Sequence, residues 1–198
     1  MTPLSPDVLL AALRLTFRQP RAAARWLMDL GLADGPRWVA FTIVAIFSAL
    51  TMSLAEMIAP PSPEMGDPSG AVALPPLVWV GMLGLGMLVT TGLVTWVGRL
   101  FGGTGRFAQA QVLVIWLQLV QVIMVLAQIV ALFLLPPVAV TIDILSIAVV
   151  FWLMSAFVAE LHGFRYSFLV FLGILGTGLA LAFVLALMLV PFVQGAGA

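Results

Sequence analysis

Five apolar stretches, each long enough to cross a lipid bilayer, dominate this chain of 198 residues. A helix needs roughly 20 apolar residues to cross the hydrocarbon core. Because lipid offers the backbone no hydrogen-bonding partners, such stretches have to be helical. The sequence therefore predicts an all-α polytopic membrane protein with five transmembrane helices. The spans are expected at about 38–59, 77–100, 107–135, 138–161 and 168–190.

The low charge of the chain excludes several other classes of protein. Only 8% of its residues are charged and 63% are hydrophobic, which is too apolar for the water-facing surface of a soluble domain. A net charge of zero excludes a nucleic-acid-binding footprint. The chain contains no cysteine, so it has no disulfide, thiolate nucleophile or thiolate metal ligand.

All eight basic residues are arginines, and every one falls on the same side of the predicted membrane. Five precede the first span, two flank the turn between the second and third spans, and one lies between the fourth and fifth. Cytoplasmic loops retain Lys and Arg whereas translocated loops lack them. This asymmetry places the N-terminus in the cytoplasm and, after five spans, the C-terminus outside. The arginines are Arg14, Arg18, Arg21, Arg25, Arg37, Arg99, Arg106 and Arg165.

Residues 1–35 form a cytoplasmic segment ahead of the membrane domain, which we expect over 36–192, with a short tail at 193–198. Two short amphipathic helices are predicted in this segment, separated at Pro20. They are too short and too charged to span, and they suit the headgroup layer of the membrane. The residues expected to contact anionic lipid headgroups are Arg14, Arg18, Arg21, Arg25 and Trp26.

Four of the five glutamines in the third span share one face of the predicted helix, within an arc of about 100°. In hydrocarbon each amide needs a partner, so this face is expected to point into the bundle or toward another subunit. Interhelical hydrogen bonding is the ordinary interpretation, and a polar track for a solute or a lipid headgroup is the alternative. The four residues are Gln111, Gln118, Gln121 and Gln128.

Three further candidates belong to the fourth span: Asp143, Glu160 and His162. Carboxylates inside a membrane are costly and count as functional candidates. Asp143 has no arginine on its side of the membrane, so it is protonated, paired with a neutral donor such as Thr141, or wetted by a cavity. At the cytoplasmic end, His162 could cap the helix or titrate near neutral pH. A single histidine is a poor metal site, so we predict no metal and no cofactor.

Four short segments lie in the cytoplasmic segment or at the ends of the predicted spans. They read Arg-Gln-Pro-Arg at 18–21, Gly-Pro-Arg-Trp at 35–38, Phe-Gly-Gly-Thr-Gly-Arg-Phe at 101–107 and His-Gly-Phe at 162–164. Together with five spans, they resemble the YIP family of Ypt/Rab-interacting membrane proteins, in its bacterial branch. The Gly-Pro pair looks like a reduced form of the Asp-Leu-Tyr-Gly-Pro motif of eukaryotic members, which bind prenylated small GTPases. The resemblance implies five helices in a bacterial inner membrane, a cytoplasmic N-terminus and no catalytic residues, and we do not extend GTPase binding to this chain.

The sequence favours a non-enzymatic integral membrane protein that organises the membrane or partner proteins. No nucleophile–base pair, metal-ligand set or nucleotide motif is present. The expected partners are the bilayer, its anionic headgroups, and a second copy of the chain or another membrane protein. The alternative is a small-solute or ion transporter or channel that uses the polar face of the third span, although five spans do not divide into two inverted halves. An intramembrane enzyme is the least favoured class, because Asp143 lies near the membrane face opposite Glu160 and His162.

Overall fold

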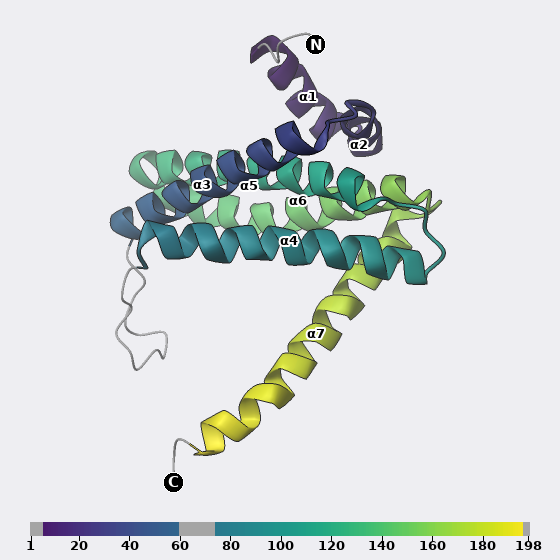
Figure 1. The fold of residues 1–198 in the computed structure, drawn as a ribbon. Coiled ribbons are helices and arrows are strands. Elements are labelled where there is room, and N and C mark those ends of the chain that lie inside the picture. Colours follow the sequence, from purple (N-terminus) through teal and green to yellow (C-terminus); the bar gives the residue numbers. More distant parts are fainter. Residues whose placement is uncertain (1–5, 60–73, 196–198) are drawn as a thin grey trace.

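The computed structural model describes residues 6–59 and 74–195, and these two ranges form seven helices (Figure 1). Within them no strand is present, and five of the helices are long and apolar enough to cross a membrane. The prediction of an all-α polytopic fold is thereby confirmed. The helices are α1 (Pro6–Arg18), α2 (Pro20–Asp29), α3 (Asp34–Ile58), α4 (Pro76–Leu100), α5 (Phe107–Leu134), α6 (Pro136–His162) and α7 (Ser167–Gly195).

Prolines and a glycine set several of the helix ends. Helices α2, α4 and α6 each carry a proline in the first turn, where the missing N–H leaves no hydrogen bond unmade. Helix α6 ends at Gly163, whose φ of 71° lies in the left-handed region. The N–H of Phe164 then donates to the carbonyl of Ala159 at 2.8 Å, a closure typical of helix C-termini.

Two long helices extend past the ends that the sequence suggested. Helix α3 begins at Asp34, ahead of position 38, because Asp34 pairs with Arg37 across the first turn at 2.6 Å. Helix α7 continues to Gly195 instead of ending at 190. Pro191 removes only one backbone hydrogen bond, which a transmembrane helix tolerates, and so the first part of the expected tail belongs to α7. Residues 196–198 lie outside the described residues.

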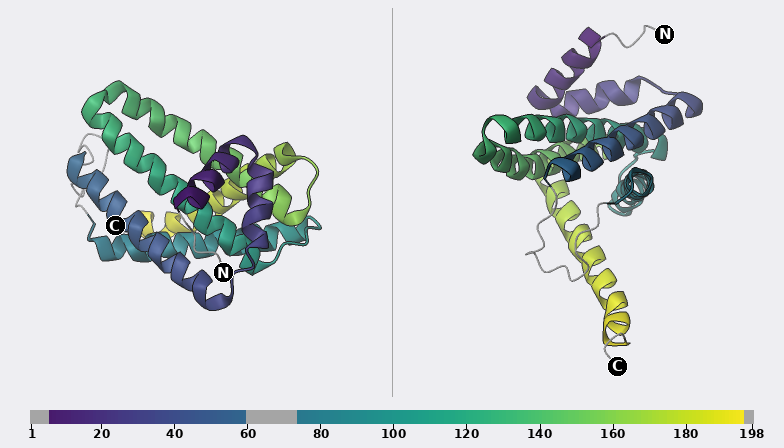
Figure 2. Two further views of the ribbon diagram at one scale, coloured as in Figure 1. Left: turned by 90° about the horizontal axis from the view of Figure 1, so that it is seen from above. Right: turned by 90° about the vertical axis from the view of Figure 1, so that its left-hand side faces the viewer.

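Helices α3, α4, α5 and α6 run alongside one another as a bundle, whereas α7 leaves one end of this bundle and diverges from it (Figures 1 and 2). Helix α5 lies at the centre and is buried without interruption over residues 111–117. Trp116 and Phe157 belong to a cluster that joins α5 and α6 to the short helices. Phe41 and Met87 belong to a second cluster that joins α3, α4 and α5.

The short helices pack on the side of the bundle near one of its ends. Ala12 of α1 and Leu27 of α2 enter the same cluster as residues of α5 and α6. Thr16 is fully buried, donates to the carbonyl of Ala12 at 2.8 Å and accepts the indole N–H of Trp116 at 2.9 Å. The predicted amphipathic helices therefore have one side that belongs to the protein core.

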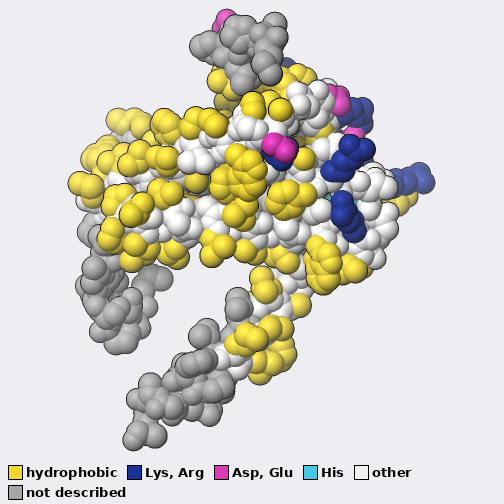
Figure 3. Space-filling view, in the orientation of Figure 1, with side chains coloured by type: hydrophobic (Ala, Val, Ile, Leu, Met, Phe, Trp, Pro, Cys, Tyr) yellow, Lys and Arg dark blue, Asp and Glu magenta, His cyan; other side chains and the backbone are white. Residues whose placement is uncertain are grey.

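Charged side chains gather at the end of the bundle where α6 turns into α7, while the bundle sides are covered with hydrophobic side chains (Figure 3). Leu85, Phe133 and Ile144 are among the exposed large residues on those sides, as expected for helices that face lipid. We call the charged end the arginine end. Its arginines are Arg21, Arg25, Arg99, Arg106 and Arg165.

Candidate functional site: the arginine end and the groove beside α7

Glu160 joins α2 to the end of α6. Arg25 donates to one carboxylate oxygen from Nε at 2.9 Å and from Nη2 at 2.6 Å, and Nε of Arg21 lies 3.7 Å from the other. Arg21 also donates to the backbone carbonyls of Phe164 and Arg165 in the turn that follows α6. The hydrogen bond to Glu160 raises the pKa of Arg25 above its usual value. Arg25 thus binds the last turn of α6, and Arg21 holds the turn between α6 and α7 in place.

A second polar contact holds α3 against α5. Arg37 is only 8% exposed, and its Nε donates to Oε1 of Gln111 at 2.7 Å. The same guanidinium donates to Asp34 at 2.6 Å and to the carbonyl of Leu32 at 3.4 Å. A buried cation has to be paired in this way to offset its desolvation. Gln111 is fully buried, and its Nε2 has no hydrogen-bond partner among the described residues.

The other glutamines of the predicted polar face lie further along α5. Nε2 of Gln118 donates to Oγ of Ser48 at 3.1 Å, a second link between α5 and α3. Gln121 and Gln128 are half-buried, and neither makes a side-chain hydrogen bond to any described residue. The interhelical bonding that the sequence suggested is therefore present at Gln111 and Gln118. A functional role for the four amides stays a prediction.

Asp143 lies on the exposed surface of α6, away from the packed interior. Thr141, the neutral donor considered for it, instead donates to the carbonyl of Pro137 at 3.1 Å. Glu160 and His162 lie at the other end of the same helix. The three titratable residues of α6 therefore do not converge on one site, and a role for Asp143 stays a prediction.

His162 sits in a cradle of three glycines at the end of α6 and is only 3% exposed. Its Nδ1 accepts the N–H of Gly105 at 3.2 Å, and Nε2 lies 3.0 Å from the carbonyl of Val94, so the ring is neutral with its hydrogen on Nε2. A Cβ at Gly98 or Gly103 would lie 2.2 Å from a ring nitrogen, and one at Gly105 would lie 2.7 Å from the ring. With both nitrogens engaged, the ring joins α4, the following turn and α6, and it offers no lone pair to a metal ion.

Helix α1 presents a mixed apolar and basic surface. Leu10 and Phe17 are 49% and 45% exposed. Arg14 and Arg18 are exposed as well, a position compatible with the predicted contact to lipid headgroups. Among the other three residues predicted for that contact, Arg21 and Arg25 face Glu160, and Trp26 is half-buried against the core. Headgroup contact stays a prediction for all five.

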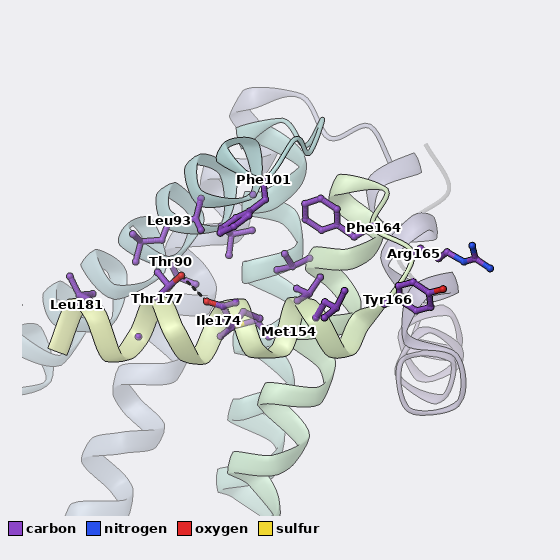
Figure 4. A pocket seen from close by; sticks show the side chains of 18 residues that line it. Thr90, Leu93, Phe101, Met154, Phe164, Arg165, Tyr166, Ile174, Thr177 and Leu181 are labelled. Carbon is purple, nitrogen blue, oxygen red and sulfur yellow. Dashed lines mark hydrogen bonds between the residues drawn. The ribbon is translucent and has the colours of Figure 1, made fainter. Parts of the chain in front are cut away.

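A groove of about 450 Å³ runs between α4, α6 and α7 and reaches the arginine end (Figure 4). Its walls are almost entirely apolar, with the hydroxyls of Thr90 and Thr177 inside and with Arg165 and Tyr166 at the arginine end. None of the four glutamines of the polar face lines it. Sequence reasoning missed this groove, because its walls bring α4 together with the later helices α6 and α7 and carry no motif.

These features define a small polytopic membrane protein of α-helices, with a charged end and an apolar lateral groove. Within the described ranges, no three metal-ligating side chains come together. Residues 14–189 match the family model described as the Yip1 domain, and the chain therefore belongs to the Yip1 family. The family membership agrees with the resemblance noted in the sequence. No curated protein and no solved structure matches this chain.

Proposed function

We propose that this Yip1-family protein is non-enzymatic and organises the surrounding membrane or partner proteins through the exposed surface of α1. The observation that carries the proposal is the surface of α1. One side of α1 is held in the core by Thr16, whereas Leu10, Phe17 and two arginines remain exposed. A helix with apolar and basic residues on its free surface suits a membrane interface or the groove of a partner. The Yip1 family is not known as a family of enzymes.

We infer that the arginine end faces the cytoplasm and that the membrane is the inner membrane of a bacterium. The support is the placement of all eight arginines in segments that share one side of the five spans, as the positive-inside rule requires. The N-terminus then lies in the cytoplasm, and the C-terminus lies outside. In this orientation α1 and α2 meet the anionic cytoplasmic leaflet.

The packing of the polar residues favours this function over transport. Gln111 and Gln118 use their side chains to join α5 to α3. Asp143 lies on the outer surface of α6, on no polar route through the bundle. A transporter needs polar groups that line a shared path near the middle of the membrane, and the groove beside α7 is apolar instead.

Site-specific photocrosslinking in cells tests the proposal. A photoreactive residue at Leu10 or Phe17 is expected to give discrete adducts with a protein or an anionic lipid. Replacing both Arg14 and Arg18 by glutamine should lower their yield by about thirtyfold, since each arginine near an anionic surface contributes about 1 kcal/mol. The matched control is Leu85, which is 63% exposed on α4 but carries no neighbouring charge on its own turn.

A flux assay with the purified protein in liposomes distinguishes the proposed function from transport. We expect no uptake of solute or ions above that of empty vesicles. The proposal would be overturned in favour of transport by two results together. The yield of adducts at α1 would be unchanged when both arginines are replaced, and the liposomes would show a flux that Asp143→Asn abolishes.

A further inference from the structure

We propose that the groove between α4, α6 and α7 binds one anionic phospholipid, with an acyl chain along the groove and the phosphate at Arg165. This inference goes beyond the proposed function, because it concerns the groove beside α7 and does not depend on the surface of α1. It rests on the polarity of the groove, the charge at its arginine end and the glycines in its wall.

The interior of the groove suits a hydrocarbon chain. Of its two hydroxyl groups within the helices, that of Thr177 already donates to the carbonyl of Gly173 at 2.8 Å (Figure 4). The remaining lining is formed by side chains such as Leu93, Met154 and Ile174 (Figure 4). A volume of about 450 Å³ falls in the range of ligand sites. A compact polar headgroup would lose its hydration in this interior without gaining partners.

The arginine end of the groove suits a phosphate. Arg165 is exposed, and its guanidinium projects beyond the groove while its Cζ lies 5.3 Å from the centre of the Tyr166 ring (Figure 4). Among the described residues no carboxylate pairs with it, and none of the residues that line the groove is acidic. The turn that carries Arg165 is held by Arg21, which donates to its backbone carbonyl at 3.3 Å. An arginine placed in this way forms charge-assisted hydrogen bonds with a phosphate at headgroup level.

The glycines of α7 leave room on the wall of the groove. A Cβ added at Gly173 or Gly178 would meet no atom within 4 Å, although both residues line the groove. Packing inside the chain therefore does not explain them, in contrast to Gly98, where a Cβ would strike His162. The divergence of α7 leaves an apolar surface between three helices, and a lipid chain in it contacts protein on more sides than a chain at the outer face of the bundle.

Native mass spectrometry of the full chain tests the site, with phosphatidylglycerol and phosphatidylcholine of identical acyl chains as probes. We expect one phosphatidylglycerol to be retained per chain, and retention of phosphatidylcholine to be at least fivefold weaker. Arg165→Gln should weaken phosphatidylglycerol about fivefold, the factor for one arginine near an anionic headgroup, and should leave phosphatidylcholine unchanged. Free inorganic phosphate should not compete, because the acyl chain supplies most of the contact.

Filling the groove separates a specific site from general lipid contact. Gly173→Leu should abolish retention of phosphatidylglycerol. The matched control is Gly176→Leu, since Gly176 also has open space around its Cα but does not line the groove. Gly178→Leu blocks the same wall and replaces Gly173→Leu if that variant does not fold. Equal retention of the two lipids, or equal retention by blocking and control variants, would overturn the site. Adducts at α1 should not change in the blocked variant, so this site and the proposed function fail separately.

Discussion

Replacing Gly98 by alanine would drive a methyl group into the imidazole of His162. The added Cβ would lie 2.2 Å from Nε2 and 2.5 Å from two ring carbons. The ring cannot turn aside without breaking its hydrogen bonds to the N–H of Gly105 and the carbonyl of Val94. Gly98→Ala therefore tests whether the glycine cradle holds α4 and α6 together.

The expected loss of stability follows from three contributions. Overpacking costs about 1–3 kcal/mol, and the two hydrogen bonds contribute about 1 kcal/mol each. Alanine is favoured over glycine in a helix by about 1 kcal/mol. The net destabilisation is about 2–4 kcal/mol, which lowers the unfolding midpoint by roughly 5–15 °C for a chain of this size. The assay is the monodisperse fraction that survives heating in detergent, measured by size-exclusion chromatography.

Gly92→Ala is the matched control in the same helix. A Cβ at Gly92 would meet no atom within 4 Å, so this change should leave the midpoint unchanged or raise it slightly. In the double variant Gly98→Ala/His162→Ala the clash disappears, and the two changes should couple by about 1–3 kcal/mol. Equal midpoints for Gly98→Ala and Gly92→Ala, or a cost of Gly98→Ala that persists without the imidazole, would refute the reasoning.

Two further predictions concern the polar residues and the topology. Gln111→Leu should destabilise the protein by about 2 kcal/mol, because buried Arg37 loses a charge-assisted hydrogen bond, whereas Gln128→Leu should have little effect; thermal midpoints compare the two variants, and equal losses would contradict the assigned contact. The chain has no cysteine, so Thr104→Cys at the arginine end and Leu135→Cys at the opposite end each introduce a single thiol. In intact spheroplasts a membrane-impermeant maleimide should label only the second, and the reverse pattern would invert the proposed orientation.

Much of the architecture could be predicted because its causes are local. The five spans follow from apolar length, since every backbone group in a bilayer has to be bonded within its own helix. Prolines in the first turns of α4 and α6 and a glycine after α6 mark where these helices begin and end. Where a helix end in the structure differs from the predicted end of a span, the cause lies in a single turn. The pairing of Asp34 with Arg37 at the start of α3 is an example.

The candidate site could be predicted only in part. Helical spacing placed four glutamines on one face of α5, but it did not reveal that Gln111 receives a hydrogen bond from Arg37 and that Gln118 donates to Ser48. The sequence predicted that Arg21 and Arg25 contact anionic lipid headgroups. It could not show that these arginines meet Glu160, a residue more than a hundred positions away.

The sequence alone determined the class, the spans and the asymmetric distribution of arginines, because hydrophobic length and charge act through the solvent and need no particular neighbour. The tertiary structure decided what each polar residue meets. It surrounded His162 with three glycines, paired the arginines of α2 with the end of α6, and opened a groove between α4 and α7. These features depend on how helices cross and on how closely their backbones approach, and such distances arise only when segments remote in the chain are packed together.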